Sequence, residues 1–170
     1  MNIFITSECP IESALALPVV LRNKMIVEGC QMLSTAHRVL DGDAYADDKS
    51  LYKKTHHNHP SAVSIQKSRD GYNWLFLHTV ALAELYQEHT GKIHLSCNKF
   101  QALEIAPISC QNNSFQPTIA APDQFKQIAN SFTVFRGYQE YLNFKFREWS
   151  SREKPVKLEW PFGKPSWLSL

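Results

Sequence analysis

Hydrophobic residues recur along this chain mainly at the spacing of α-helices. Between residues 19 and 40, the side chains of one stripe follow each other at steps of four, three, four and three positions, which places them on one face of a helix. This apolar stripe consists of Ile26, Cys30, Leu33, His37 and Leu40. A polar stripe with the same steps consists of Lys24, Glu28, Gln31, Thr35 and Arg38. Gly29 and Ala36 lie between the two stripes and are small enough for another element to approach closely.

Two further long helices follow from the same reasoning. The stretch from Tyr72 to Thr90 is apolar nearly all round, which is typical of a central, buried helix, and Gly91 ends it. Its His78 is therefore expected in the core. A third helix is expected from a Ser131 cap to Trp149. Its predicted buried face is Phe135, Tyr138, Leu142, Phe146 and Trp149, and its predicted outer face is Arg136, Glu140, Asn143 and Arg147.

Shorter elements are expected in the first half of the chain. Residues 1–6 are apolar and suit an extended segment, and a turn at 7–10 leads into a short helix. Residues 40–50 form an acidic loop that contains a glycine. Another helix is expected to begin at Pro60, after a cap at Asn58 or His59, and to break at the sequence SRDG, residues 68–71.

The second half ends irregularly. Residues 92–122 are predicted to be mostly loop, and Asp123 is predicted to cap a short helix. The tail contains three prolines and is expected to wrap over the core through Trp160, Phe162 and Trp167. No alternating strand pattern stands out. The sequence thus predicts a single all-α domain over residues 1–170, with a helical core over 1–149 and an irregular aromatic tail over 150–170.

Composition narrows the class of protein only moderately. The chain has 170 residues, 44% hydrophobic and 20% charged, which is typical of a globular domain with a real core. A net charge of +2 permits a local basic patch without indicating nucleic acid by itself. The four cysteines show no paired spacing and are expected to be reduced. The first apolar stretch is interrupted by Pro18 and preceded by Glu8 and Glu12, which argues against a secretory signal. A cytoplasmic protein without a membrane partner is the expectation.

Three histidines in four positions, His56, His57 and His59, precede Pro60 and leave three interpretations open. They could supply two or three ligands to zinc, although a helical HExxH motif is absent. They could form the structural start of a helix. They could also contact phosphates together with the basic residues nearby, Lys53, Lys54, Lys67 and Arg69.

Glu28 is the carboxylate with the most chemical interest. It stands one helical turn after Lys24, which is compatible with a plain surface ion pair. It also stands beside Gly29, which would leave room for a substrate next to a catalytic carboxylate. The C-terminal third interleaves basic residues with aromatics, a composition that suits contact with unstacked bases. Most of those aromatics have helical core spacing, so packing accounts for about half of this signal.

Three blocks of the sequence carry a resemblance. They are VEGCQMLSTAHRVLDG (27–42), THHNHPSA (55–62) and GYNWL (71–75). They are similar to short phage and bacterial proteins that in turn resemble pyrimidine-dimer DNA glycosylases of the endonuclease V type. Those enzymes are small and all-helical, flip a base out of the duplex and cleave its N-glycosidic bond with the help of a glutamate. Some also nick the strand through their N-terminal amine.

The resemblance implies an enzyme that acts on double-stranded DNA with damaged or modified bases, with pyrimidines as the bases expected from this family. It would act as a monomer without cofactor or metal. Glu28 would be the catalytic carboxylate. Because Asn2 is bulky, Met1 is expected to be retained, so base removal is expected rather than strand nicking, with Lys24 as an alternative amine. The residues expected at the DNA or the flipped base are Asn2, Arg22, His37, Arg38, His56, His57, His59, Lys67, Arg69, Tyr72, Trp74, Arg136, Lys145 and Arg147. The alternatives are an enzyme of phage base modification, a non-catalytic DNA- or protein-binding module, and a zinc hydrolase.

Overall fold

The computed structural model describes residues 2–170. The prediction that Met1 is retained concerns a residue outside this range. Within this range every regular element is helical, which confirms the all-α prediction. The elements are α1 (Pro10–Leu15), α2 (Val19–Leu40), α3 (Asp43–Asp48), α4 (Pro60–Gln66), α5 (Arg69–Thr90), the 3-10 helix η1 (Leu95–Lys99), α6 (Phe100–Leu103), α7 (Asp123–Ser131) and α8 (Val134–Ser150). No helix of the described chain is long and apolar enough to cross a membrane.

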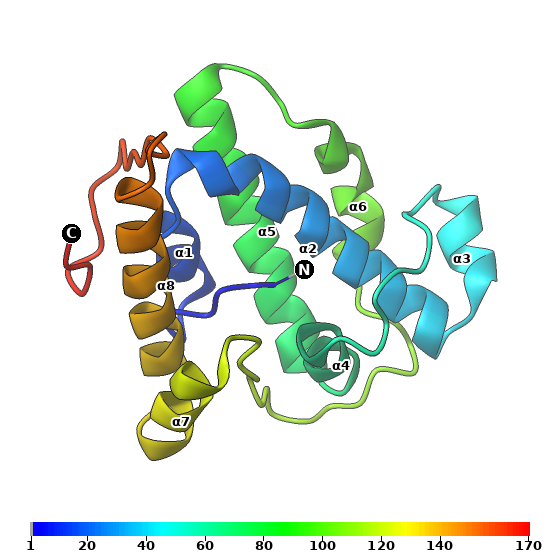
Figure 1. Cartoon of the computed structure of the whole chain (residues 1–170). Helices are drawn as coiled ribbons and strands as arrows, with labels where there is room; N and C mark the ends of the chain where they lie inside the picture. The colour runs from blue at the N-terminus through cyan, green and yellow to red at the C-terminus, as the bar shows by residue number, and fades with distance from the viewer. Residues whose placement is uncertain (1) are drawn as a thin grey trace.

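Two long helices, α2 and α5, pack against each other at the centre of the molecule (Figure 1). Gly29 makes this close approach possible, because a Cβ atom at that position would lie 2.3 Å from Thr79 Oγ1 of α5. The predicted core histidine, His78, is 1% exposed on α5. The short helices α1 and α4 pack against α5 and complete this layer.

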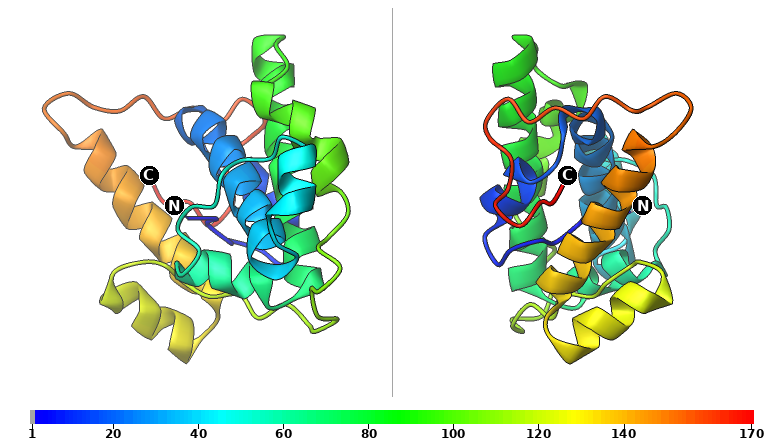
Figure 2. Two further views of the ribbon diagram at one scale, coloured as in Figure 1. Left: turned by 90° about the vertical axis from the view of Figure 1, so that its right-hand side faces the viewer. Right: turned by 60° about the vertical axis from the view of Figure 1, so that its left-hand side comes forward.

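The N-terminal segment lies between the central helix pair and α8 (Figures 1 and 2). Ile3 and Ile5 are fully buried, and the ring of Phe4 meets the ring of Tyr138 edge-on at 6.1 Å. Gln139 of α8 donates a hydrogen bond to the carbonyl of Thr6. The expected extended segment is therefore present, and it fills the core between α2 and α8.

The helix boundaries differ from the prediction where local caps decide them. Ser68 caps α5 by accepting the N–H of Gly71, so the sequence SRDG starts a helix where a break was expected. Thr133 caps α8, whereas Ser131 is the last residue of α7. Asp123 is likewise the first residue of α7 and not its cap. The acidic loop contains α3, and part of the predicted loop 92–122 forms η1 and α6.

The polar stripe of α2 is exposed only at its start. Thr35 and Arg38 are buried, because the segment that follows α3 runs back over this face. Thr35 Oγ1 accepts the N–H of Thr55 at 3.2 Å, and Arg38 Nε donates to the carbonyl of Tyr52 at 2.8 Å. Periodicity within one helix could not show that a distant segment covers it.

The tail wraps over the core as predicted and is held at both ends. Near its start, the N–H of Val19 donates to the carbonyl of Glu159, and Trp160 Nε1 donates to the carbonyl of Ala16. Near its end, the N–H of Ser169 donates to Asn143 Oδ1 at 2.9 Å. Asn143 was expected on the outer face of α8 and is buried instead, because the tail covers it.

Candidate functional site

Glu28 lies mid-way along α2, where the N-terminal segment meets the helix. Its side chain is 13% exposed, and its Oε2 accepts the backbone N–H of Asn2 at 3.0 Å. On the solvent side its Oε1 lies 3.5 Å from the ammonium of Lys24, which is 70% exposed. The predicted Lys24–Glu28 pair is therefore present. The carboxylate is also held by a backbone donor that is 26 positions away in the sequence.

Asn2 is itself fixed by a closed hydrogen-bond network. Its side-chain amide donates to the carbonyl of Ala120 at 2.7 Å, while the N–H of Ala120 donates to the hydroxyl of Tyr138 at 3.0 Å. That hydroxyl in turn donates to Asn2 Oδ1 at 2.8 Å. Burial raises the pKa of Tyr138 to about 12, so the phenol keeps its proton as a donor. The network fixes the backbone of residue 2 and with it the orientation of the Glu28 carboxylate.

His59 stands directly before α4. Its Nδ1 accepts the N–H of Ser61 at 3.3 Å and caps the helix, as predicted. Burial lowers the pKa of His59, the charge of His56 lowers it further, and that of Glu28 raises it. Because Nδ1 is an acceptor, we infer that any proton on the neutral ring is on Nε2.

The other two clustered histidines are more exposed. His56 has a positive φ of 47°, and its Nδ1 lies 2.6 Å from the hydroxyl of Thr55. His57 is exposed, and its carbonyl accepts a hydrogen bond from Gln66. In residues 2–170, no three His, Cys, Asp or Glu side chains are grouped so that they could hold a metal ion.

Lys145 of α8 is a half-buried amine that lies against two aromatic rings. Its Nζ lies 4.7 Å from the centroid of the Trp149 ring and 5.7 Å from that of Tyr141. Burial is the main cause that lowers the pKa of Lys145, and the charges of Arg152 and Lys24 act in the same direction. The charge of Glu148 raises this pKa and opposes them. The ammonium beside Glu28 is that of Lys24.

Gly29 does not leave space for a substrate beside Glu28, as its position in the sequence had suggested. Thr79 of α5 occupies that space.

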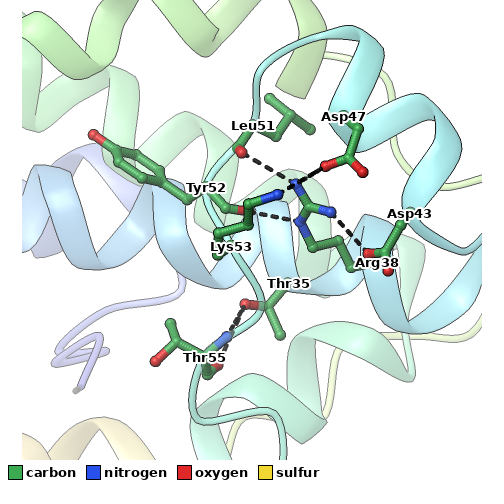
Figure 3. Close-up of polar contacts among 8 residues, drawn as sticks. All are labelled: Thr35, Arg38, Asp43, Asp47, Leu51, Tyr52, Lys53 and Thr55. Atoms are coloured by element: carbon green, nitrogen blue, oxygen red, sulfur yellow. Dashed lines mark hydrogen bonds and ion pairs between the residues drawn. The ribbon is translucent and has the colours of Figure 1, made fainter.

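Three residues that were expected at DNA phosphates or the flipped base are buried away from this cluster. Arg22 is 2% exposed, and Phe162 of the tail lies over its guanidinium. His37 is 3% exposed and bonds the hydroxyl of Tyr72 at 3.0 Å. Arg38 bonds Asp43 and Asp47, each at 2.8 Å, and two backbone carbonyls (Figure 3). The prediction that these three contact DNA is wrong for this conformation, because their donors face the protein interior.

The two residues that were predicted to stack on a base, Tyr72 and Trp74, are buried within the fold. Tyr72 is fully buried and donates to the carbonyl of Leu103 at 2.8 Å. Trp74 is 8% exposed, stacks on His78 and donates to the carbonyl of Glu8 at 2.7 Å. Neither ring is accessible to a base.

The remaining predicted contacts are on the surface but at separate places. Arg69 holds the loop that carries Asn112, through a bond of 2.8 Å. Arg136 pairs with Glu140, and Arg147 donates to the carbonyl of Ser169 in the tail. Lys67 is exposed at the end of α4, where it lines a cavity beside residues 113–118.

Sequence reasoning missed two residues of the site, Tyr138 and Ala120. Tyr138 has core spacing on its helix, and nothing in that spacing shows that its hydroxyl reaches the N-terminal segment. Ala120 contributes only backbone groups and lies in a stretch without a periodic pattern. No local signal in the sequence could have identified either of them.

Comparison with known proteins adds no relative: no family model, curated protein or solved structure matches the chain.

Proposed function

We propose that this chain is a DNA glycosylase that excises a damaged or modified base, with Glu28 as its catalytic carboxylate. The single observation that supports this most is the fixed position of that carboxylate. It is largely buried, and a backbone N–H from the N-terminal segment holds it. A surface ion pair alone would not need a donor from 26 positions away.

The proposed reaction breaks the bond between C1′ of the sugar and the nitrogen of the base. As the bond breaks, the electron pair leaves with the base and positive charge develops on the sugar. A carboxylate beside the sugar stabilises this charge, or removes a proton from the water that attacks C1′. The departing base takes up a proton from solvent, and a neutral His59 with its proton on Nε2 is a candidate donor of a hydrogen bond to it.

The proposed substrate is double-stranded DNA, bound by a single copy of the chain in the cytoplasm. Lys24 beside Glu28, the half-buried Lys145 of α8, and the exposed His56 and His57 are groups that suit contact with phosphates. Flipping a nucleotide costs a few kcal/mol and is cheapest for a damaged or mismatched base, which favours such bases as substrates.

The test is base release from a panel of DNAs: undamaged, ultraviolet-irradiated, and phage genomes with modified pyrimidines. Released base is identified by mass spectrometry, and abasic sites are counted with an aldehyde-reactive probe. Glu28→Gln keeps an oxygen that can accept the Asn2 N–H but removes the charge. We expect it to slow base release by about 100-fold or more while DNA binding persists.

Glu84→Gln, an exposed carboxylate on α5, is the matched control and should act like wild type. No base release from any DNA, or equal rates for wild type and Glu28→Gln, would overturn the proposal. Binding without release would instead favour a DNA-binding module.

Strand nicking is a separate outcome of the same assay. A Schiff base requires an amine next to the abasic sugar, and Lys24 Nζ is 3.5 Å from Glu28 Oε1. We expect base removal without nicking, and therefore no protein–DNA adduct after borohydride reduction. An adduct that Lys24→Arg abolishes would assign the nicking amine to Lys24.

A further inference from the structure

A second cavity lies under the C-terminal tail and shares no residue with the Glu28 cluster. Its volume is about 410 Å³, which falls within the range of small-molecule sites. Tail residues 162–167 form one wall. The facing wall includes Thr6 and Ser7 of the N-terminal segment, Ala16 after α1, and Gln139 of α8.

Buried polar atoms without a partner occur at this cavity, on Thr6, and next to it on Arg22, which contacts the lining residue Phe162. Thr6 lines it and is 2% exposed, yet its Oγ1 has no hydrogen-bond partner among the described residues. Arg22 is 2% exposed, and its Nε donates to the carbonyl of Leu17 at 3.1 Å. Its Nη1 and Nη2 are likewise without a partner in residues 2–170. Buried groups of this kind are rare in proteins unless a ligand, an ion or ordered water satisfies them.

Phe162 connects Arg22 with the cavity. Its ring lies over the guanidinium, with Arg22 Cζ 5.3 Å from the ring centroid, and the same residue lines the cavity. Phe162 is 36% exposed, so one face is covered by the protein and another is accessible to solvent. If this side chain turned aside, the face of the guanidinium that the ring covers would be uncovered.

The tail around Phe162 is built for such a local movement. Residues 161–166 make their hydrogen bonds within the tail, such as that from the N–H of Gly163 to the carbonyl of Trp160 at 3.1 Å. The anchors to the helices lie outside this loop, at Trp160 on one side and at Ser169 on the other. The loop can therefore shift without releasing the tail.

We propose that this cavity binds a small phosphorylated ligand of mononucleotide size, whose phosphate pairs with Arg22 once the ring of Phe162 turns aside. A guanidinium with two free amino groups matches a phosphate in a bidentate geometry. Lys164 lines the cavity and adds a second positive charge, and the hydroxyl of Thr6 adds a donor.

Two further lining residues favour a nucleotide over inorganic phosphate. Trp167 offers an aromatic surface on which a base can stack. Glu12 is exposed at the cavity and accepts a hydrogen bond from Ser7 Oγ. Its carboxylate repels a phosphate but can accept a hydrogen bond from a sugar hydroxyl. The phosphate therefore belongs at the Arg22 side and the sugar at the Glu12 side.

The test is a titration of the full chain with uridine 5′-monophosphate, inorganic phosphate and uridine, followed by calorimetry and by the fluorescence of the nearby tryptophans. We expect the monophosphate to bind more tightly than phosphate, and uridine to bind far more weakly than either. Arg22→Gln should weaken binding of the monophosphate by about tenfold or more, as for loss of a charged hydrogen-bonding partner. Lys164→Ala should weaken it by a smaller factor, and Lys154→Ala, an exposed tail lysine, should leave it unchanged.

Phe162→Ala is expected to increase the affinity for phosphate, and a misfolded variant would not show such an increase. Without the ring over Arg22, inorganic phosphate should bind more tightly than it does to wild type. If Arg22→Gln does not fold, Lys164→Ala and Phe162→Ala still decide. Equal affinities for uridine and its monophosphate, no binding at millimolar concentration, or no gain with Phe162→Ala would overturn the proposal. This site does not depend on the glycosylase proposal, and base release does not enter its test.

Discussion

Arg38 best tests whether a basic residue of α2 stabilises the fold or contacts DNA. The resemblance to DNA glycosylases placed Arg38 at a phosphate or the flipped nucleotide, whereas its side chain is only 3% exposed in the folded chain. The guanidinium joins α2 to α3 and to the segment after it: Nη1 bonds Asp43, Nη2 bonds Asp47, and Nε bonds the carbonyl of Tyr52 (Figure 3). We therefore predict that Arg38→Met destabilises the fold and leaves DNA affinity of the folded protein unchanged.

The expected loss of stability depends on which groups lose a hydrogen-bond donor when Arg38 is replaced. The methionine keeps the apolar stem but leaves two carbonyls, of Leu51 and Tyr52, without the Arg38 donor. A buried group that loses its partner costs about 1–3 kcal/mol. Asp43 and Asp47 are 68% and 55% exposed and regain water, so they add little. We expect a loss of about 3 kcal/mol, or roughly 6–12 °C in Tm for a chain of this length.

Urea unfolding followed by tryptophan fluorescence measures this loss. Arg136→Met is the matched control, because Arg136 forms an exposed ion pair with Glu140 and should change the free energy of unfolding by less than about 1 kcal/mol. A second readout is the pKa of Asp47, which the hydrogen bond from Arg38 lowers and which should rise in the variant. An Arg38→Met protein of unchanged stability, with a shallower salt dependence of DNA binding, would refute the structural role and restore the phosphate contact.

Three other substitutions test the packing around the central helices. Gly29→Ala should destabilise the fold by about 1–3 kcal/mol in urea unfolding, because its Cβ would lie 2.3 Å from Thr79 Oγ1. A second substitution, Thr79→Ala, should recover most of this loss. A Gly29→Ala protein of unchanged stability would contradict the close packing of α2 and α5. Tyr72→Phe should cost about 1–3 kcal/mol by the same measurement, since the carbonyl of Leu103 loses its donor; an unchanged midpoint would show that this carbonyl finds another partner. His78 is fully buried and burial lowers its pKa to about 4. The unfolded chain, with a histidine pKa near 6.5, therefore binds more protons between about pH 6.5 and 4, and up to about 3 kcal/mol of stability should be lost as pH falls through that window. His78→Asn should flatten this part of the pH profile, and an identical profile would show that other groups cause it.

Local patterns in the sequence were sufficient for the helical class. The steps of four and three in α2 and the continuous apolar run in α5 require burial on helical faces, whatever the rest of the chain does. Gly29 could be recognised as a point of close approach for the same reason. The histidine before Pro60 could be recognised as a cap, because capping involves only neighbours along the chain.

The candidate site could be predicted only in part. Glu28 stood out as a carboxylate at the edge of an apolar stripe, but its backbone donor comes from Asn2 and its support from Tyr138. These contacts join segments 26 and 136 positions apart, and no local periodicity encodes them.

The basic residues show the same limit more clearly. One helix contains Arg22, Lys24 and Arg38, and its sequence pattern alone does not show which of these side chains is buried. In the folded chain the tail covers Arg22, the segment after α3 covers Arg38, and only Lys24 remains in solvent. The sequence by itself determined which residues share a helix face, because that depends on the helical repeat. Which faces became interior, surface or site was decided only by the tertiary structure, because burial depends on which distant segment packs over each face.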